Sequence, residues 1–235
     1  VDWRAVFTQK WNRELIFGYQ KTSYNWRVAT IPLGVGGRAY GGVAITQKLV
    51  DAFAMDTEHG GRYPITGYQA DGSPVIDPQS GYDESGFTSF THPILGSTKS
   101  TYNMYLNREP RFYASIGFDR GTFEIDDKIL TLQLRGGELH GSTLKETDEY
   151  QSCTGYLCQK WIHKSSTYNQ SKNSYNYRKY AYPYLRLPEL FYNYAEADFE
   201  YNGSLSPLSL EYLNRVRKRC GLPRFQDSRA LVGGI

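Results

Sequence analysis

The sequence predicts an α+β fold in which helices and short antiparallel strands are joined by long irregular loops. Three observations lead to this prediction. Two helices with clear boundaries follow one another between 188 and 221, and apolar and polar residues alternate between 112 and 134 as in strands. The stretches 20–42 and 56–93 show neither the helical nor the strand period. With 235 residues, of which 40% are hydrophobic, the chain can bury a core in one or two domains.

The N-terminal part predicts a helix, a strand, a loop and a second helix. Aromatic residues recur every four positions within residues 1–13, which is typical of a short helix, and the apolar run 14–19 has the length of a strand. Residues 20–42 are rich in glycine and form an irregular loop, for which a packed surface loop and a ligand-contacting loop stay open as interpretations. Residues 44–55 predict a helix with Thr46 as its cap.

The stretch 56–93 combines Gly, Pro, Ser and Asp with regularly scattered aromatic residues. No helical or strand period is visible in it, so we expect a long surface loop. The scattered aromatic side chains argue against disorder. This loop is therefore a second candidate for ligand contact.

The middle of the chain predicts a small antiparallel meander. Residues 112–118, 122–125 and 130–134 alternate between apolar and polar side chains, with turns between them. The acidic residues Asp126 and Asp127 lie in the second turn. Adjacent turn residues point apart, so they are more typical of a turn than of a glycosidase pair, whose carboxylates lie roughly 5–10 Å apart.

The most clearly bounded elements are the two helices near the C-terminus. Pro188 suits the first turn of one helix and Gly203 its end, and Ser206 and Gly221 take the matching places around the next helix. A stripe of residues at helical spacing runs along the first helix: Leu190, Tyr194, Ala197 and Tyr201. The two helices therefore predict a helical hairpin.

Composition and charge exclude several classes of function. The net charge of +3 and the short basic run 215–219 do not indicate a nucleic-acid partner, and that run suits the negative end of a helix dipole. No apolar run is long enough to span a bilayer. Cys153 and Cys158 lie near His163, but their spacing does not match common zinc sites, and a disulfide between the two cysteines stays open. We therefore expect no metal and no cofactor.

Three segments, taken together, resemble the C-terminal part of the SusD/RagB family. They are the end of the helical hairpin, LNRVRKRCGLP at 213–223, then NREPRFYASI at 107–116 and TGYLCQKW at 154–161. The resemblance implies a SusD-like C-terminal domain over residues 1–235, with a small antiparallel sheet and a closing helical hairpin. It also implies that the N-terminal helical-repeat half of such a protein is absent, so that the chain is a fragment or an expressed domain.

The family resemblance further implies a non-catalytic protein that captures oligosaccharides at the cell surface. Such proteins lie on the extracellular face of the outer membrane, held by a lipid anchor, and deliver their ligand to a SusC-like TonB-dependent transporter. Binding of peptides or glycopeptides, hydrolysis of glycans, and a pure protein-interaction role stay open as alternatives. No catalytic motif for hydrolysis is present in the sequence.

The residues that we expect to contact ligand come from the two long loops. Aromatic faces cover the C–H surfaces of sugars, and a few polar groups fix the orientation of the ligand. Because the chain holds 21 tyrosines, loop position rather than residue type selects the candidates: Tyr24, Trp26, Arg27, Tyr63, Tyr68 and Tyr82.

Overall fold

The computed structural model describes residues 9, 11–19, 29–36, 39, 41–141, 152–178 and 180–227. In these ranges the elements follow in this order: β1 (Leu15–Tyr19), α3 (Gln47–Asp51), β2 (Ile65–Tyr68), β3 (Pro74–Ile76), β4 (Phe87–Thr91), β5 (Thr98–Tyr102), the 3-10 helix η1 (Asn103–Tyr105), α4 (Pro110–Ser115), β6 (Ile116–Gly117), β7 (Thr122–Ile125), β8 (Lys128–Thr131), β9 (Leu157–Cys158), β10 (Thr167–Asn169), β11 (Ser174–Asn176), β12 (Tyr182–Arg186), α5 (Leu187–Asn202) and α6 (Pro207–Arg219). The predicted mixture of helices and small antiparallel sheets is confirmed.

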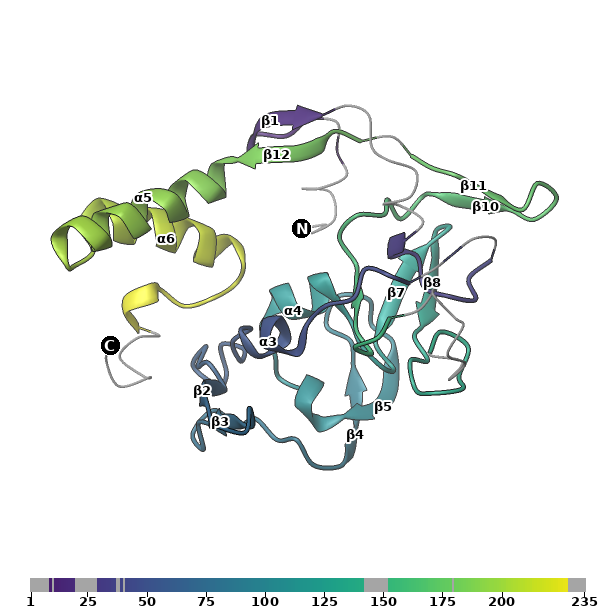
Figure 1. Ribbon diagram of the computed structural model, residues 1–235, viewed down its shortest axis with the longest axis horizontal. Coiled ribbons are helices and arrows are strands. Elements are labelled where there is room, and N and C mark those ends of the chain that lie inside the picture. The colour runs from purple at the N-terminus through teal and green to yellow at the C-terminus, as the bar shows by residue number, and fades with distance from the viewer. Residues whose placement is uncertain are drawn as a thin grey trace.

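The elements form an elongated arrangement, with α5 and α6 at one end and the β10–β11 hairpin at the other (Figure 1). All described strands belong to two-stranded antiparallel sheets, and most of these sheets are hairpins of consecutive strands. Two sheets join distant segments: β1 pairs with β12, and β6 pairs with β9. The β1–β12 pair connects the segment just before α5 to the N-terminal part of the chain. The β6–β9 pair attaches the strand that follows α4 to residues 157–158.

The predicted meander is correct in its second half and wrong in its first. β7 and β8 form a hairpin around Asp126 and Asp127, whose φ angles of 56° and 52° are those of a tight two-residue turn that matches strand twist. The segment that we expected as a strand over 112–118 instead forms helix α4 and then the short β6. Pro110 occupies the first turn of α4, and the residues after it are buried on every side, so their alternation carries no information about a sheet face.

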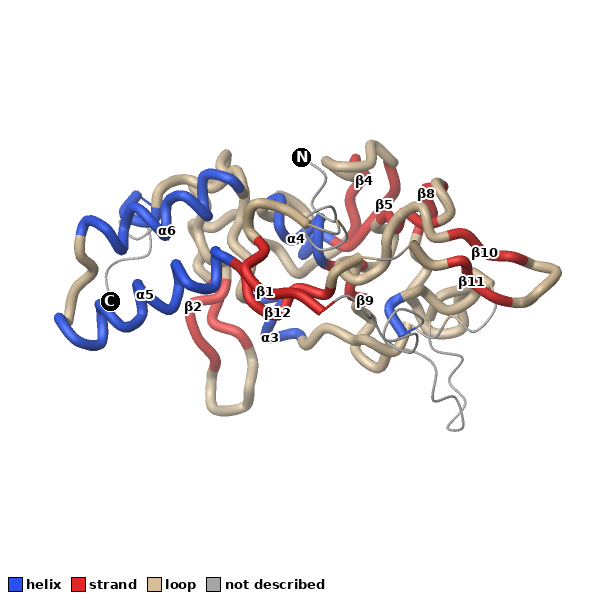
Figure 2. Tube along the Cα trace, turned by 90° about the horizontal axis from the view of Figure 1, so that it is seen from above, coloured by secondary structure: helices blue, strands red, loops and turns tan. Residues whose placement is uncertain are grey.

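The expectation of an irregular loop over 56–93 is also wrong. This region contains the β2–β3 hairpin and the strand β4, which pairs with β5. The strands are short and largely exposed, and threonine and serine occupy much of β4 and β5, so no hydrophobic period marks them. In Figure 2 the β2–β3 hairpin projects from the body of the protein beside α3.

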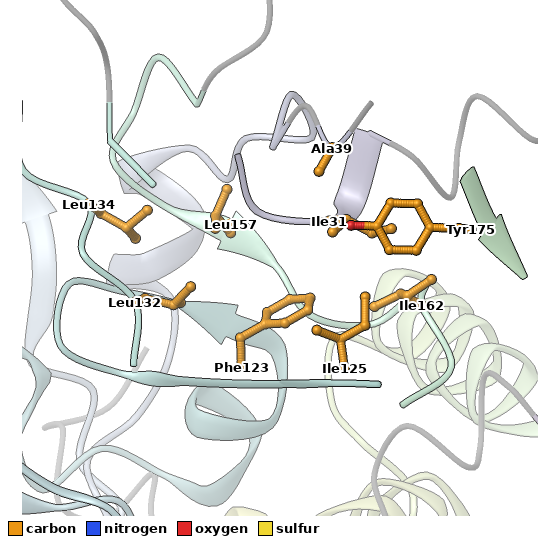
Figure 3. Packing of buried hydrophobic residues seen from close by; sticks show 9 residues of the cluster. All are labelled: Ile31, Ala39, Phe123, Ile125, Leu132, Leu134, Leu157, Ile162 and Tyr175. Carbon is orange, nitrogen blue, oxygen red and sulfur yellow. The ribbon is translucent and has the colours of Figure 1, made fainter. Parts of the chain in front are cut away.

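Two hydrophobic clusters form the core of the body. The first packs β7 and the chain after β8 against β9 and the 29–36 segment (Figure 3), through Ile31, Ala39, Phe123, Ile125, Leu132, Leu134, Leu157, Ile162 and Tyr175. The second joins α3, η1 and α4 through Val50, Met104, Tyr105, Phe112, Tyr113, Ile116, Phe118 and Tyr156. The aromatic second cluster supports the site described below, because α3 and the end of β5 pack on it.

The helical hairpin agrees closely with the sequence prediction. Ser206 caps α6 by accepting from the backbone N–H of Ser209 at 3.3 Å, and Gly203 ends α5 in the left-handed conformation at φ 67°. Phe191 of α5 stacks on Tyr212 of α6 with ring centres 4.6 Å apart. The predicted stripe of α5 lies on its exposed side, whereas the residues that α5 buries are Pro188 and Ala195. None of the described helices is both long and apolar enough for a bilayer crossing.

Candidate functional site

The sequence candidates fall in three different places. Tyr24, Trp26 and Arg27 lie outside the described residues. Tyr63 lies against the end of α6, where its hydroxyl accepts a hydrogen bond from Nη1 of Arg217 at 3.4 Å. The remaining two, Tyr68 and Tyr82, lie at or beside a pocket between α3, the β2–β3 hairpin and the end of β5.

We call this hollow the tyrosine–carboxylate pocket. Its volume is about 380 Å³, within the range of small-molecule sites. Tyrosine rings, carboxylates and one amide side chain form its wall, and the full set of lining residues is Gln47, Lys48, Asp51, Tyr68, Gly72, Pro74, Glu84, Tyr102 and Met104. The residues come from sequence positions far apart, and the fold brings them together.

A chain of hydrogen bonds fixes the α3 side of the pocket. The hydroxyl of Tyr156 donates to Oε1 of Gln47 at 2.8 Å, and Nε2 of Gln47 donates to Oδ1 of Asp51 at 2.7 Å. The hydroxyl of Tyr68 donates to the other oxygen, Oδ2 of Asp51, at 2.8 Å. Asp51 is therefore held from both sides, and the ring of Tyr68 is placed at the rim with 45% of its surface exposed.

Glu84 is the second carboxylate in the wall of the pocket. Its Oε1 accepts a hydrogen bond from the hydroxyl of Tyr82 at 2.8 Å, and its backbone carbonyl accepts one from the hydroxyl of Tyr102. Burial and the nearby carboxylate of Glu84 raise the pKa of Tyr82, so this phenol stays a proton donor. Among the described residues, Oε2 of Glu84 has no hydrogen-bond donor, which leaves it available to a ligand.

Arg108 is a buried residue that holds the elements around the pocket in place. It is almost completely buried, and its Nη2 donates to the carbonyls of Val50 at 2.7 Å and Phe53 at 2.9 Å. These carbonyls lie at the end of α3, where a cation suits the helix dipole. The guanidinium carbon lies 5.2 Å from the centre of the Tyr82 ring, within cation–π distance. Arg108 thus holds both α3 and the Tyr82 ring in place.

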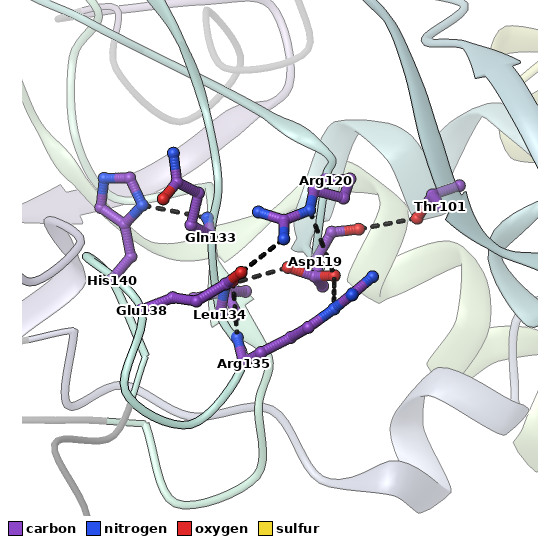
Figure 4. Close-up of polar contacts among 8 residues, drawn as sticks. All are labelled: Thr101, Asp119, Arg120, Gln133, Leu134, Arg135, Glu138 and His140. Carbon is purple, nitrogen blue, oxygen red and sulfur yellow. Dashed lines mark hydrogen bonds and ion pairs between the residues drawn. The ribbon is translucent and has the colours of Figure 1, made fainter. Parts of the chain in front are cut away.

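A polar network anchors the hairpin that carries Tyr102 (Figure 4). Oγ1 of Thr101 donates to the carbonyl of Asp119 at 2.7 Å, and the carboxylate of Asp119 accepts from Nε of Arg135 at 2.8 Å. Arg135 in turn lies 4.9 Å from the ring centre of the exposed Phe87, which contacts Tyr102 at 5.3 Å. Aromatic surface therefore continues from the pocket onto the exposed side of β4.

The pocket combines hydrogen-bond acceptors with the exposed ring of Tyr68 and the half-buried ring of Tyr102. Carboxylates accept strong hydrogen bonds from hydroxyl groups, and tyrosine rings offer flat apolar faces with polar tips. Such a wall suits a neutral ligand with many hydroxyl groups. The described residues contain no cluster of His, Cys, Asp or Glu that would hold a metal ion, and all three cysteines there are free thiols, so Cys153 and Cys158 form no disulfide.

Comparison with known proteins gives the family. The model of the SusD family matches residues 3–232. The chain belongs to the SusD family. A search of curated proteins gave no match.

Two solved structures resemble the chain in fold. A structure named BT4246 superimposes with a TM-score of 0.70 at 22% identity, covering 98% of this chain and 40% of that one. A SusD-like protein, BF3747 from Bacteroides fragilis NCTC 9343, gives a TM-score of 0.63 at 27% identity, covering 98% of this chain and 42% of the other. The chain thus spans about two fifths of the length of these two proteins.

Members of the SusD family share a general role. SusD proteins are typically nutrient-binding proteins, generally non-catalytic, that are associated with the outer membrane at the cell surface and with SusC-like transporters. Sequence reasoning selected only Tyr68 among the lining residues of the pocket, and it missed the polar residues Gln47, Asp51, Glu84 and Tyr102. The helix predicted over 44–55 contained two of them, but no local pattern linked that helix to residues 84 and 102.

Proposed function

We propose that this SusD-family chain binds an oligosaccharide in the tyrosine–carboxylate pocket without altering it chemically. The observation that carries the proposal is the convergence of two tyrosine rings, Tyr68 and Tyr102, with the carboxylates of Asp51 and Glu84 on one pocket. In this proposal a sugar ring lies against the exposed face of Tyr68, and its hydroxyls donate to the carboxylate oxygens.

The hydrogen bonds that hold Asp51 in the pocket favour a role in binding over a role in catalysis. Both oxygens of Asp51 already accept hydrogen bonds, from Gln47 and from Tyr68. A carboxylate in that state serves as an acceptor, whereas a general acid must carry a proton that it can deliver to a leaving group. A ligand hydroxyl can still use the remaining lone pairs of Asp51 and the open Oε2 of Glu84.

Calorimetric titration with a panel of neutral oligosaccharides and peptides tests the proposal. We expect one or more oligosaccharides to bind, and Tyr68→Ala to weaken that binding about tenfold, because a lost aromatic contact costs about 1.4 kcal/mol. Tyr201→Ala is the matched control, since Tyr201 is exposed on α5 and lines no part of the pocket. Equal oligosaccharide affinities of the Tyr68→Ala and Tyr201→Ala variants would show that the ligand does not bind in this pocket.

Hydrolysis of the same ligand is the second candidate, because two carboxylates line one pocket. The two functions differ in the fate of the oligosaccharide after long incubation. Capture leaves the chain length of the ligand unchanged, as chromatography of the mixture will show. New reducing ends formed by the wild type, and not by the Glu84→Gln variant, would show that the protein is a hydrolase instead.

Delivery to a transporter completes the proposed role. We propose that residues 1–235 form the C-terminal part of a longer protein with an N-terminal helical-repeat part, anchored by lipid on the extracellular face of the outer membrane. The coverage of only 40% of BT4246 supports this proposal. The proposed partner is a SusC-like TonB-dependent transporter, and co-purification from membranes with an affinity-tagged full-length protein tests it. A preparation free of any such transporter would count against delivery.

A further inference from the structure

One face of the β4–β5 hairpin continues the wall of the tyrosine–carboxylate pocket. Phe87 of β4 and Tyr102 of β5 are paired directly across the two strands, so their side chains lie on the same face of the hairpin. Their ring centres are 5.3 Å apart. Tyr102 lines the pocket, whereas Phe87 is not one of its lining residues and is 57% exposed. The two rings therefore join the pocket to the surface of the hairpin.

The two faces of the hairpin carry different side chains. Side chains alternate along a strand, so the face of Phe87 and Tyr102, which we call the outward face, also carries small exposed hydroxyl side chains: Ser89, Thr91, Thr98 and Ser100. The opposite face packs on the body, where Phe90 stacks on Tyr113 with ring centres 5.3 Å apart and Thr101 is fully buried. The outward face is thus a strip of hydroxyl groups that begins with two aromatic rings at the pocket.

The segment that leads from the pocket to Phe87 is held against the end of β5. Nδ2 of Asn103 donates to Oδ2 of Asp83 at 3.0 Å, and the backbone N–H of Asn103 donates to the carbonyl of Gly86 at 3.1 Å. These hydrogen bonds fix the backbone on both sides of Glu84. A ligand therefore meets the ring of Phe87 already in place, which lowers the conformational entropy lost on binding.

Arg135 holds the ring of Phe87 and places hydrogen-bond donors beside it. Its guanidinium carbon lies 4.9 Å from the centre of the ring, and its Nε donates to Oδ2 of Asp119 at 2.8 Å. The side chain of Arg135 is 47% exposed, and a guanidinium group carries further N–H donors besides Nε. A sugar ring that lies against Phe87 can accept hydrogen bonds from these donors.

The pocket itself is too small to enclose a long oligosaccharide. Its volume of about 380 Å³ is near the lower end of the range for small-molecule sites. An oligosaccharide that places one sugar unit in the pocket must therefore continue over a neighbouring surface. The outward face offers what a sugar chain needs there, because aromatic rings cover C–H surfaces and hydroxyl side chains bond to sugar hydroxyls.

We propose that the outward face of the β4–β5 hairpin is an extended subsite, which binds the next sugar units of an oligosaccharide whose first unit occupies the pocket. Phe87 stacks on one of these units, and Arg135 donates to its hydroxyl groups. The protein therefore binds longer oligosaccharides more tightly than disaccharides. This inference rests on the proposed function and adds to it a preference for ligand length.

Calorimetric titration with oligosaccharides of increasing length tests the proposal. The ligands are cello-, xylo-, manno- and malto-oligosaccharides, each as the disaccharide, the tetrasaccharide and the hexasaccharide. In the series that binds, we expect the affinity of the wild type to rise about tenfold from the disaccharide to the tetrasaccharide. Phe87→Ala should remove most of this gain and leave the disaccharide affinity unchanged, whereas Phe87→Tyr, which keeps a flat ring, should retain the gain. Tyr68→Ala should weaken the binding of every length.

Phe17→Ala is the matched control, because Phe17 is 63% exposed on β1 and lines no part of the pocket, so the dependence on length should stay that of the wild type. The extended subsite alone is overturned if Tyr68→Ala weakens binding while Phe87→Ala keeps the full gain with length. It is also overturned if Phe87→Ala weakens every length equally, because Phe87 would then act only by supporting the pocket. If no oligosaccharide binds, or if Tyr68→Ala has no effect, the proposed function fails and the subsite fails with it.

Discussion

His92 makes the stability of this protein sensitive to acid. It is 3% exposed and packs among aromatic rings, with Tyr113 at 5.4 Å and Phe118 at 6.2 Å between ring centres. Its Nδ1 accepts from the backbone N–H groups of Ile94 and Leu95, both at 3.3 Å, so the ring is neutral with its proton on Nε2. Burial lowers the pKa of His92 from 6.5 to about 4.

The magnitude follows from these two pKa values. Because the unfolded chain binds the proton more tightly than the folded one, the contribution of His92 is fully present above pH 6.5 and is lost as the pH falls toward 4. The loss in the free energy of unfolding is about 1.4 kcal/mol at pH 5.5 and about 2.5 kcal/mol at pH 4.5. Protonation also removes the acceptor that both backbone N–H groups use.

Urea unfolding of the wild type and of His92→Asn, at pH 7.5, 5.5 and 4.5, measures this effect. Asparagine keeps an acceptor near the position of Nδ1 and does not titrate. The variant should be less stable at pH 7.5, because the aromatic packing is lost, and should lose less stability on acidification than the wild type, by about 2.5 kcal/mol at pH 4.5. Parallel pH profiles of the two proteins would show instead that the acid sensitivity comes from groups other than His92.

Three further changes test the supports of the pocket and of the helical hairpin. Arg108→Lys should lower the free energy of unfolding by about 3 kcal/mol, since an ammonium group cannot bridge the carbonyls at the end of α3 as the guanidinium does, and urea unfolding with no loss would contradict this. Gly203→Ala should cost about 1 kcal/mol, because the residue has a left-handed φ of 67°, and thermal melting against Gly67→Ala, in a strand with open space around it, provides the comparison. Tyr82→Phe should cost about 1 kcal/mol through the lost hydrogen bond to Glu84, and an unchanged melting temperature would show that this bond is not stabilising.

Local chemistry explains which elements the sequence predicted correctly. The ends of α5 and α6 depend on a serine cap, prolines in the first turns and a left-handed glycine, all of which act within a few residues. The β7–β8 hairpin depends on its two-residue turn in the same way. Helix α4 was mispredicted because it is buried on all sides, and the 56–93 hairpins were missed because their short exposed strands carry no hydrophobic period.

The residues of the pocket could be predicted only in part, because tertiary packing rather than local sequence brings them together. Tyr68 and Tyr82 were selected because they are aromatic residues in a region without a clear period, and both lie at or beside the pocket. Asp51 and Glu84 were not selected, because nothing in the local sequence marks either acidic residue as part of a site. The two carboxylates line one pocket only because α3 and the chain between β3 and β4 pack together. Tyr63 was selected on the same grounds as Tyr68, but tertiary packing places it against Arg217.

The structure of a complex with a bound oligosaccharide would show whether the tyrosine–carboxylate pocket is the binding site. Crystals should be soaked with the tightest ligand from the calorimetric panel. We predict a sugar ring in van der Waals contact with the ring of Tyr68, and ligand hydroxyls within hydrogen-bond distance of Asp51 and Glu84. An oligosaccharide bound on another face, with the tyrosine–carboxylate pocket unchanged and filled only by water, would contradict it.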